Sequence, residues 1–227
     1  MISGMNAHTK RPRTGTKTVL VTGFEPFGGA QHNPSLEIVR ALHGRAIGGH
    51  RIAGEVLPCV FGLANRELRR LLRRHRPGLV FCLGLAAERG EISLERIAIN
   101  VDDARIPDNA GRQPVDRPVV RSGPAAYWST LPIKAIVAAL RERGIPGRVS
   151  QTAGTFVCNH VFYGLMHALR RRPGVRGGLA HVPEMAGLER AGAAGMERET
   201  MIAAIAIGIE VALRTRRDRR IGGGATQ

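Results

Sequence analysis

Cys158 is the side chain whose position in the sequence best suits a nucleophile. It follows a short β-rich run, 149–153, and a glycine-containing turn, and it falls in the first turn of a helix predicted over 158–172. The start of a helix carries about half a positive charge and free backbone N–H groups, which stabilise a thiolate and can bind an oxyanion. The alternative is a small buried side chain, and this interpretation suits Cys59 and Cys82.

A thiolate nucleophile needs a base, and the base needs a third group to orient it. His181 lies at the carboxyl end of a strand predicted over 178–182, where a parallel sheet would bring it beside Cys158. His160 is two positions after Cys158 on the same helix, so its side chain points to another face. Glu95 interrupts an apolar extended run, where a carboxylate is costly unless it is paired. The residue pattern leaves four candidates for the orienting group: Glu25, Glu91, Glu95 and Asp102.

Phe24 and Phe27 follow the first predicted strand, in a loop that is rich in glycine. Two aromatic rings beside exposed backbone groups would suit a small, flat ligand. The alternative is that both rings belong to the hydrophobic core beneath the loop. The glycines form neither a GxxxxGK[ST] nor a GxGxxG pattern, so the loop is no phosphate-binding motif.

The elements that must position these residues alternate along the chain. Such alternation predicts βαβ units and a mainly parallel sheet that is covered on both faces. Ligands of open α/β sheets bind outside the carboxyl ends of the strands, which is where Cys158, His181 and the Phe24 loop fall. The predicted strands are 18–21, 51–57, 79–83, 91–101, 149–153 and 178–182, and the predicted helices are 34–42, 63–74, 131–143, 158–172 and 197–214.

The length of 227 residues suits one domain, and 43% hydrophobic residues exclude wholesale disorder. We expect a flexible basic leader over 1–16, a single α/β hydrolytic domain over 17–216 and a flexible basic, glycine-rich tail over 217–227. The longest apolar run, 201–209, is too short to span a membrane, and the first 17 residues hold no apolar segment typical of a secretory signal. Three cysteines without a CxxC pair predict neither a disulfide framework nor a zinc site, so we expect a cytoplasmic protein without a metal or cofactor.

The formal net charge of +16 raises the possibility of nucleic-acid binding. Half of this excess lies in the two ends of the chain, 1–17 and 214–227. Much of the remainder lies at the ends of predicted helices, where cations complement the helix dipole. With 4% aromatic residues there are few rings for stacking on bases, so a solvated, arginine-rich surface is the favoured interpretation.

Several blocks of sequence, in order over about 18–183, resemble the pyroglutamyl-peptidase I (pyrrolidone-carboxylate peptidase) family. The most specific block is TAGTFVCNHVFYGLM at 152–166, which contains Cys158. The other blocks are VLVTGFEPFGG at 19–29, NPS at 33–35, ER at 95–96 with Asn100, ARIPDN at 104–109 and GPAAYW at 123–128.

The resemblance implies a cysteine exopeptidase that removes N-terminal 5-oxoproline (pyroglutamate) from peptides. It implies Cys158 as nucleophile, His181 as general base and acid, and Glu95 as the group that orients the histidine. Phe24 and Phe27 would line the pocket for the pyrrolidone ring. The implied fold is a single-domain, three-layer α/β/α sandwich with a mainly parallel (mixed) central sheet, assembled as a homo-oligomer, either a tetramer or a dimer, and needing no metal.

The chain departs from the family pattern at two places. Leu85 and Glu88 stand where relatives often carry glutamine and glycine, and Glu184 follows Pro183 in place of an aromatic, proline-rich continuation. These departures keep open a related cysteine hydrolase with altered acyl specificity. The net charge keeps open a non-catalytic nucleic-acid-binding protein on the same fold.

Overall fold

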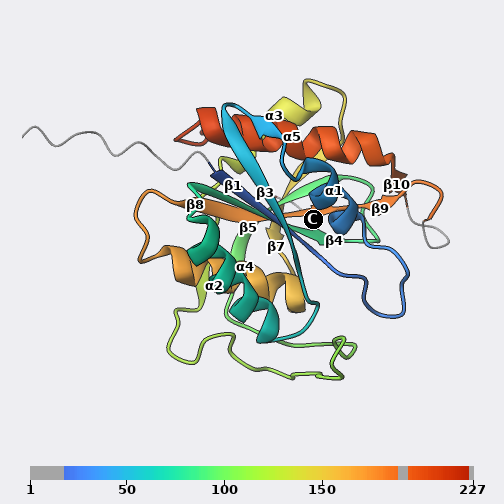
Figure 1. The fold of residues 1–227 in the computed structure, drawn as a ribbon, viewed down its shortest axis with the longest axis vertical. Helices are drawn as coiled ribbons and strands as arrows, with labels where there is room; N and C mark the ends of the chain where they lie inside the picture. Colours follow the sequence, from blue (N-terminus) through green and yellow to red (C-terminus); the bar gives the residue numbers. More distant parts are fainter. Residues whose placement is uncertain (1–17, 189–193, 225–227) are drawn as a thin grey trace, which may run out of the picture.

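The computed structural model describes residues 18–188 and 194–224, which form a layered α/β structure (Figure 1). The helices are α1 (Pro34–Leu42), α2 (Leu63–His75), α3 (Ile133–Arg141), α4 (Val157–Leu169) and α5 (Arg198–Arg214). The strands are β1 (Thr18–Phe24), β2 (Ala46–Ile47), β3 (His50–Leu57), β4 (Leu79–Leu85), β5 (Ile92–Ile99), β6 (Ala126–Trp128), β7 (Gly147–Thr152), β8 (Arg176–Val182), β9 (Glu184–Met185) and β10 (Gly195–Met196).

The main sheet has the strand order β2-β3-β1-β4-β8-β5-β6, and β7 pairs with β5 beside this path. Strands β3, β1, β4 and β8 run parallel, so their carboxyl ends meet at one edge. Strand β5 runs antiparallel to β8, with Ser93 opposite His181, and β7 runs parallel to β5. The sheet is therefore mixed, and β5 brings its residues to the end of β8 from the opposite direction.

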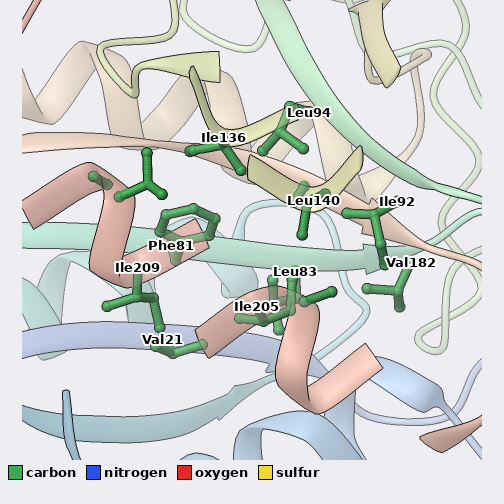
Figure 2. Close-up of a cluster of buried hydrophobic side chains, with 14 of the residues drawn as sticks. Val21, Phe81, Leu83, Ile92, Leu94, Ile136, Leu140, Val182, Ile205 and Ile209 are labelled. Carbon is green, nitrogen blue, oxygen red and sulfur yellow. The ribbon is translucent and has the colours of Figure 1, made fainter. Parts of the chain in front are cut away.

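Alternating residues of the central strands bury two different hydrophobic clusters. In β1, Val19 and Val21 pack with α1, α3 and α5, whereas Leu20 packs on the other face with α2 and α4. Figure 2 shows the first cluster, in which Ile136 of α3 and Ile205 of α5 lie over Phe81 of β4. A strand that is buried on both faces has a continuous run of apolar residues in its sequence, and 79–83 is such a run. The fold is the predicted single-domain, three-layer α/β/α sandwich.

The predicted elements lie close to the observed ones, and the strands that the prediction missed are β2, β6, β9 and β10. Each of these has only two or three residues, too few to show a periodic pattern. None of the described helices is long and apolar enough to cross a membrane.

The described part of the predicted tail over 217–227, residues 217–224, makes contacts with the domain. The carboxylate of Asp218 accepts hydrogen bonds from the backbone N–H groups of Lys134, at 3.0 Å, and Ala135, at 2.9 Å. These contacts cap α3, which is preceded by Pro132 and has no side-chain cap of its own. The carbonyl of Gly223 accepts a hydrogen bond from Arg96 at 2.6 Å. Residues 217–224 therefore pack against the domain, while the leader 1–16 and residues 225–227 lie outside the described residues.

Candidate active site

Cys158 is the second residue of α4, directly after the turn that leaves β7. The turn contains Gly154 at φ +74°, a conformation that a side chain rarely adopts. The residue at the N-cap, Phe156, offers no side-chain acceptor, so the first N–H groups of the helix are not capped by it. Cys158 is half-buried at this end of the helix, where free N–H groups could bind an oxyanion formed on a substrate.

The other two cysteines are buried thiols. Burial raises the pKa of Cys59 far above its ordinary value and raises the pKa of Cys82 to about 12. Both side chains are therefore neutral near pH 7 and belong to the hydrophobic core, as the sequence indicated.

Cys158 and His181 converge over Gly84 of β4. A Cβ atom at Gly84 would lie 2.7 Å from Sγ of Cys158 and 2.9 Å from Nε2 of His181. The register of the sheet explains this approach, since Gly84 is the partner of His181 between β4 and β8. Only glycine leaves room at this position for the thiol and the imidazole to face each other.

Glu95 orients His181 from the neighbouring strand. Its Oε1 lies 2.7 Å from Nδ1 of His181 and also accepts a hydrogen bond from Nη1 of Arg89 at 2.8 Å. The side chain is fully buried. A carboxylate can only accept from the imidazole, which places a proton on Nδ1 and leaves Nε2 facing Cys158. The antiparallel approach of β5 to β8 is what brings Glu95 to this histidine.

The surroundings of His181 favour its protonated form. Burial lowers the pKa of this imidazole, but hydrogen bonds with Cys158 and Glu95 and the negative charges of these two groups outweigh burial. Together they raise the pKa from 6.5 to about 9. At neutral pH this arrangement favours the imidazolium form of His181.

The other three candidate carboxylates have partners elsewhere. Glu25 accepts hydrogen bonds from the N–H of Cys59, at 3.1 Å, and from the side chain of Asn109, at 2.9 Å. Glu91 pairs with Arg148 at 3.2 Å. The structure therefore brings Glu95, and neither Glu25 nor Glu91, to the imidazole of His181.

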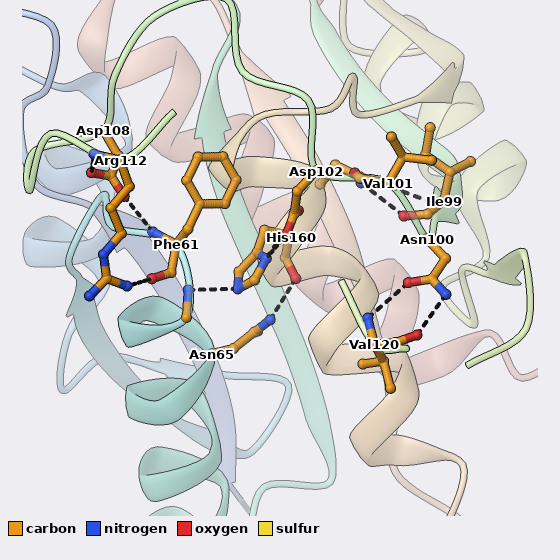
Figure 3. A network of polar contacts seen from close by, with 12 residues as sticks. Phe61, Asn65, Ile99, Asn100, Val101, Asp102, Asp108, Arg112, Val120 and His160 are labelled. Carbon is orange, nitrogen blue, oxygen red and sulfur yellow. Dashed lines mark hydrogen bonds and ion pairs between the residues drawn. The ribbon is translucent and has the colours of Figure 1, made fainter. Parts of the chain in front are cut away.

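Asp102 lies 2.8 Å from Nδ1 of His160, and both side chains are buried (Figure 3). The other nitrogen of this imidazole, Nε2, accepts a hydrogen bond from the N–H of Gly62 at 2.9 Å. His160 thus joins α4 to the start of α2 and to the segment after β5. As its helical position indicated, it does not share a face with Cys158.

The long irregular segment 102–118 is held in place by a second acidic side chain. The carboxylate of Asp108 accepts hydrogen bonds from the N–H groups of Phe61, Ala110 and Arg112 (Figure 3). Arg112 in turn donates to the carbonyl of Phe61 at 2.8 Å. A polar loop of this length therefore has a defined shape, and its residues 105–107 form one wall of a cavity.

Phe24 and Phe27 occupy different environments. Phe24 is 2% exposed, lies in the core cluster under α2 and α4, and donates its N–H to Oγ of Ser35 at 3.0 Å. Phe27 is half-buried, and its ring centroid lies 5.9 Å from that of Phe156. Phe156 also packs edge-on against Phe61 at 5.4 Å. Sequence reasoning missed Phe156 as part of the aromatic wall, although its place two residues before Cys158 was a signal.

A cavity of about 760 Å³ opens between Phe27 and the carboxyl ends of β4 and β8. The residues that depart from the family pattern, Leu85, Glu88 and Glu184, all line it. Within 18–188 and 194–224, no group of three or more His, Cys, Asp or Glu side chains is arranged to hold a metal ion.

The chain is similar to known proteins over nearly its whole length. A family model described as pyroglutamyl peptidase matches residues 17–215. The pyrrolidone-carboxylate peptidase of Klebsiella pneumoniae is 55% identical over 210 residues, which are 92% of this chain and 98% of the relative. That of Chromobacterium violaceum is 53% identical over 210 residues, with the same coverage of both chains.

Solved structures agree with the sequence comparison. The crystal structure of pyroglutamyl peptidase I from Bacillus amyloliquefaciens is 44% identical and superimposes with a TM-score of 0.89, covering 91% of this chain and 99% of that one. The pyrrolidone carboxyl peptidase from Thermococcus litoralis is 38% identical with a TM-score of 0.86 and the same coverage. With the fold, the converging side chains and the matched length in agreement, the chain belongs to the pyroglutamyl peptidase family.

Proposed function

We propose that this protein removes N-terminal 5-oxoproline from peptides, with Cys158 as nucleophile, His181 as general acid and base, and Glu95 as the group that orients His181. Membership of the family supports the removal of N-terminal pyroglutamate. The observation that carries the assignment of roles is the convergence of Cys158 and His181 over Gly84, with Glu95 on the far nitrogen of the imidazole.

The first half of the reaction forms an acyl-enzyme. The thiolate of Cys158 attacks the carbonyl carbon that joins 5-oxoproline to the next residue, and the carbonyl electron pair moves to oxygen. The uncapped N–H groups at the start of α4 stabilise this oxyanion. His181 gives its Nε2 proton to the departing amine as the C–N bond breaks, which leaves a thioester on Cys158.

The second half releases the acid. The neutral imidazole of His181 accepts a proton from water, which attacks the thioester carbonyl, and the C–S bond breaks to restore the thiolate. Glu95 stabilises the imidazolium in both halves, because its buried carboxylate remains hydrogen-bonded to Nδ1.

The acyl group is a neutral, flat lactam, and aromatic side chains suit such a group. Phe27 and Phe156 face each other beside Cys158, and Phe27 borders the cavity. Phe24 lies beneath them in the core, so in this proposal it supports the wall of the ring pocket.

A fluorogenic 5-oxoprolyl amide tests the proposal under reducing conditions. We expect hydrolysis by the wild type and none by Cys158→Ser. Prolyl and acetyl amides in the same assay test acyl specificity, and faster hydrolysis of either would favour the altered cysteine hydrolase. One equivalent of iodoacetamide should label Cys158 and abolish activity, because Cys59 and Cys82 are buried neutral thiols. Peptide mapping that finds the label on another cysteine would contradict the assignment of the nucleophile.

A further inference from the structure

The cavity beside the candidate active site carries charged side chains that the reaction itself does not use. Glu88 lines it from the turn after β4, Glu184 from β9, and Arg105 from the long irregular segment. Among the lining residues that the structure describes, these three are the charged ones. Two carboxylates against one guanidinium give this described part of the lining a net negative charge.

In the proposed mechanism the cleaved amine leaves beside His181, which protonates it. Glu184, which lines the cavity, follows His181 by three residues along the chain. Leu85, which also lines the cavity, follows Gly84, over which Cys158 and His181 converge. Phe27 borders the same space. A peptide with its 5-oxoproline against Phe27 would therefore place its second residue within reach of Glu184 and Glu88.

We propose that Glu184 and Glu88 make the enzyme select peptides whose second residue, directly after the 5-oxoproline, carries a positive charge. The inference rests on the proposed function and extends it to the leaving group. Lysine and arginine at this position would place their cations near two carboxylates, whereas glutamate would meet them with a like charge. Arg105 opposes this preference from the other wall.

The two carboxylates differ in exposure, so their effects should differ in size. Glu184 is half-buried, and its Oε1 is fixed by the N–H of Met185 at 3.2 Å. Glu88 is exposed. Solvent and salt screen an exposed charge more strongly, so Glu184 should contribute the larger part of the selectivity.

The test is a competition between peptides that differ only in the second residue. C-terminally amidated 5-oxoprolyl tripeptides with Lys, Gln, Ala or Glu in that position are mixed, and the ratios of kcat/KM are measured by mass spectrometry. Because all peptides share one enzyme sample, the ratios do not depend on how much of a variant folds. We expect the wild type to prefer Lys over Glu by about tenfold at low salt, and less at high salt.

Substitutions of the carboxylates and of Arg105 should change the Lys-to-Glu ratio of kcat/KM in opposite directions. Glu184→Gln should reduce the Lys-to-Glu ratio about threefold and Glu88→Gln about twofold, whereas Arg105→Gln should raise it about twofold. Glu91→Gln is the matched control, since Glu91 pairs with Arg148 and does not line the cavity, and it should leave the ratio unchanged.

Three negative outcomes are distinguishable. Equal rates for the Lys and Glu peptides, with the Ala peptide still hydrolysed, would overturn the inference and leave the proposed function standing. The absence of hydrolysis of every peptide by folded wild-type protein would overturn both. A Lys preference that Glu184→Gln and Glu88→Gln leave intact would also overturn the assignment to these carboxylates.

Discussion

Among the residues that the structure describes, two buried pairs of a histidine and a carboxylate differ in what faces the second imidazole nitrogen. In both pairs Nδ1 contacts the carboxylate, at 2.7 Å for His181 with Glu95 and at 2.8 Å for His160 with Asp102. Nε2 of His160 accepts a hydrogen bond from the backbone N–H of Gly62, so both ring nitrogens of His160 have a partner. Nε2 of His181 instead faces Cys158.

The comparison shows that a histidine–carboxylate pair does not by itself indicate catalysis. The same pair serves as a structural tie where a backbone group occupies the second nitrogen and as a candidate acid–base pair where a thiol does. Four experiments test this distinction.

Replacing each histidine in turn should give the largest contrast. His181→Gln removes the proposed acid and base, so we expect kcat/KM for a 5-oxoprolyl amide to fall by about 10³-fold. His160→Gln should keep kcat/KM of the folded fraction within about threefold, because this ring does not face Cys158. Equal losses of activity in the two folded variants would contradict the distinction between the pairs.

Replacing the carboxylate of the active pair should also move the pH profile. In the wild type, activity should fall as pH rises through about 9, because His181 then loses the proton that the leaving amine needs. Glu95→Gln removes a group that raises this pKa, so the alkaline limb should move to lower pH, and kcat should fall by about 10³-fold. An alkaline limb that stays in place would show that His181 does not set it.

Two glycine substitutions test the packing around each pair. Gly84→Ala would place a Cβ 2.7 Å from Sγ of Cys158, so activity should fall by about 10²-fold in a protein that still folds. Gly164→Ala would place a Cβ 2.0 Å from Oδ1 of Asn65, which holds the carbonyl of His160 through its amide at 2.8 Å. It should lower Tm and leave kcat of the folded protein nearly unchanged. Circular dichroism with active-site titration separates the two effects.

Loss of the pair formed by His160 and Asp102 should lower the stability of the protein. His160→Gln leaves the buried carboxylate of Asp102 and the N–H of Gly62 without their partner, which should lower the free energy of unfolding by about 2–3 kcal/mol. Urea denaturation measures this change. A variant as stable as the wild type would show that the pair is not a structural tie.

Much of the site could be predicted because the order of strands and helices alone indicates which residues lie at the carboxyl ends of parallel strands. The alternation of strands and helices placed Cys158 and His181 at one edge of the sheet, and the helical period excluded His160. The choice of Glu95 came from the family resemblance, since four carboxylates fitted the pattern. Glu95 is distinguished from the other three carboxylates by the antiparallel pairing of β5 with β8, and no local sequence pattern indicates this pairing.

The remaining differences also have physical causes. Phe24 and Phe27 have the same residue type three positions apart, yet one is buried under two helices and the other borders a cavity. The tail from 217 has a glycine- and arginine-rich composition, and it packs through contacts with residues far away in the chain, which a local pattern does not show. The catalytic roles, the oligomeric state and the solvated interpretation of the basic surface remain predictions.

The contact between Asp218 and α3 affects where the chain can be truncated without a loss of stability. The region shared with the family ends at residue 215, three residues before the side chain that caps this helix. A chain trimmed to the family boundary would lose the cap, at a cost of about 1 kcal/mol. Residues after 215 thus contribute to the stability of a helix more than 80 positions away in the chain, and a boundary drawn from similarity alone would remove this contribution.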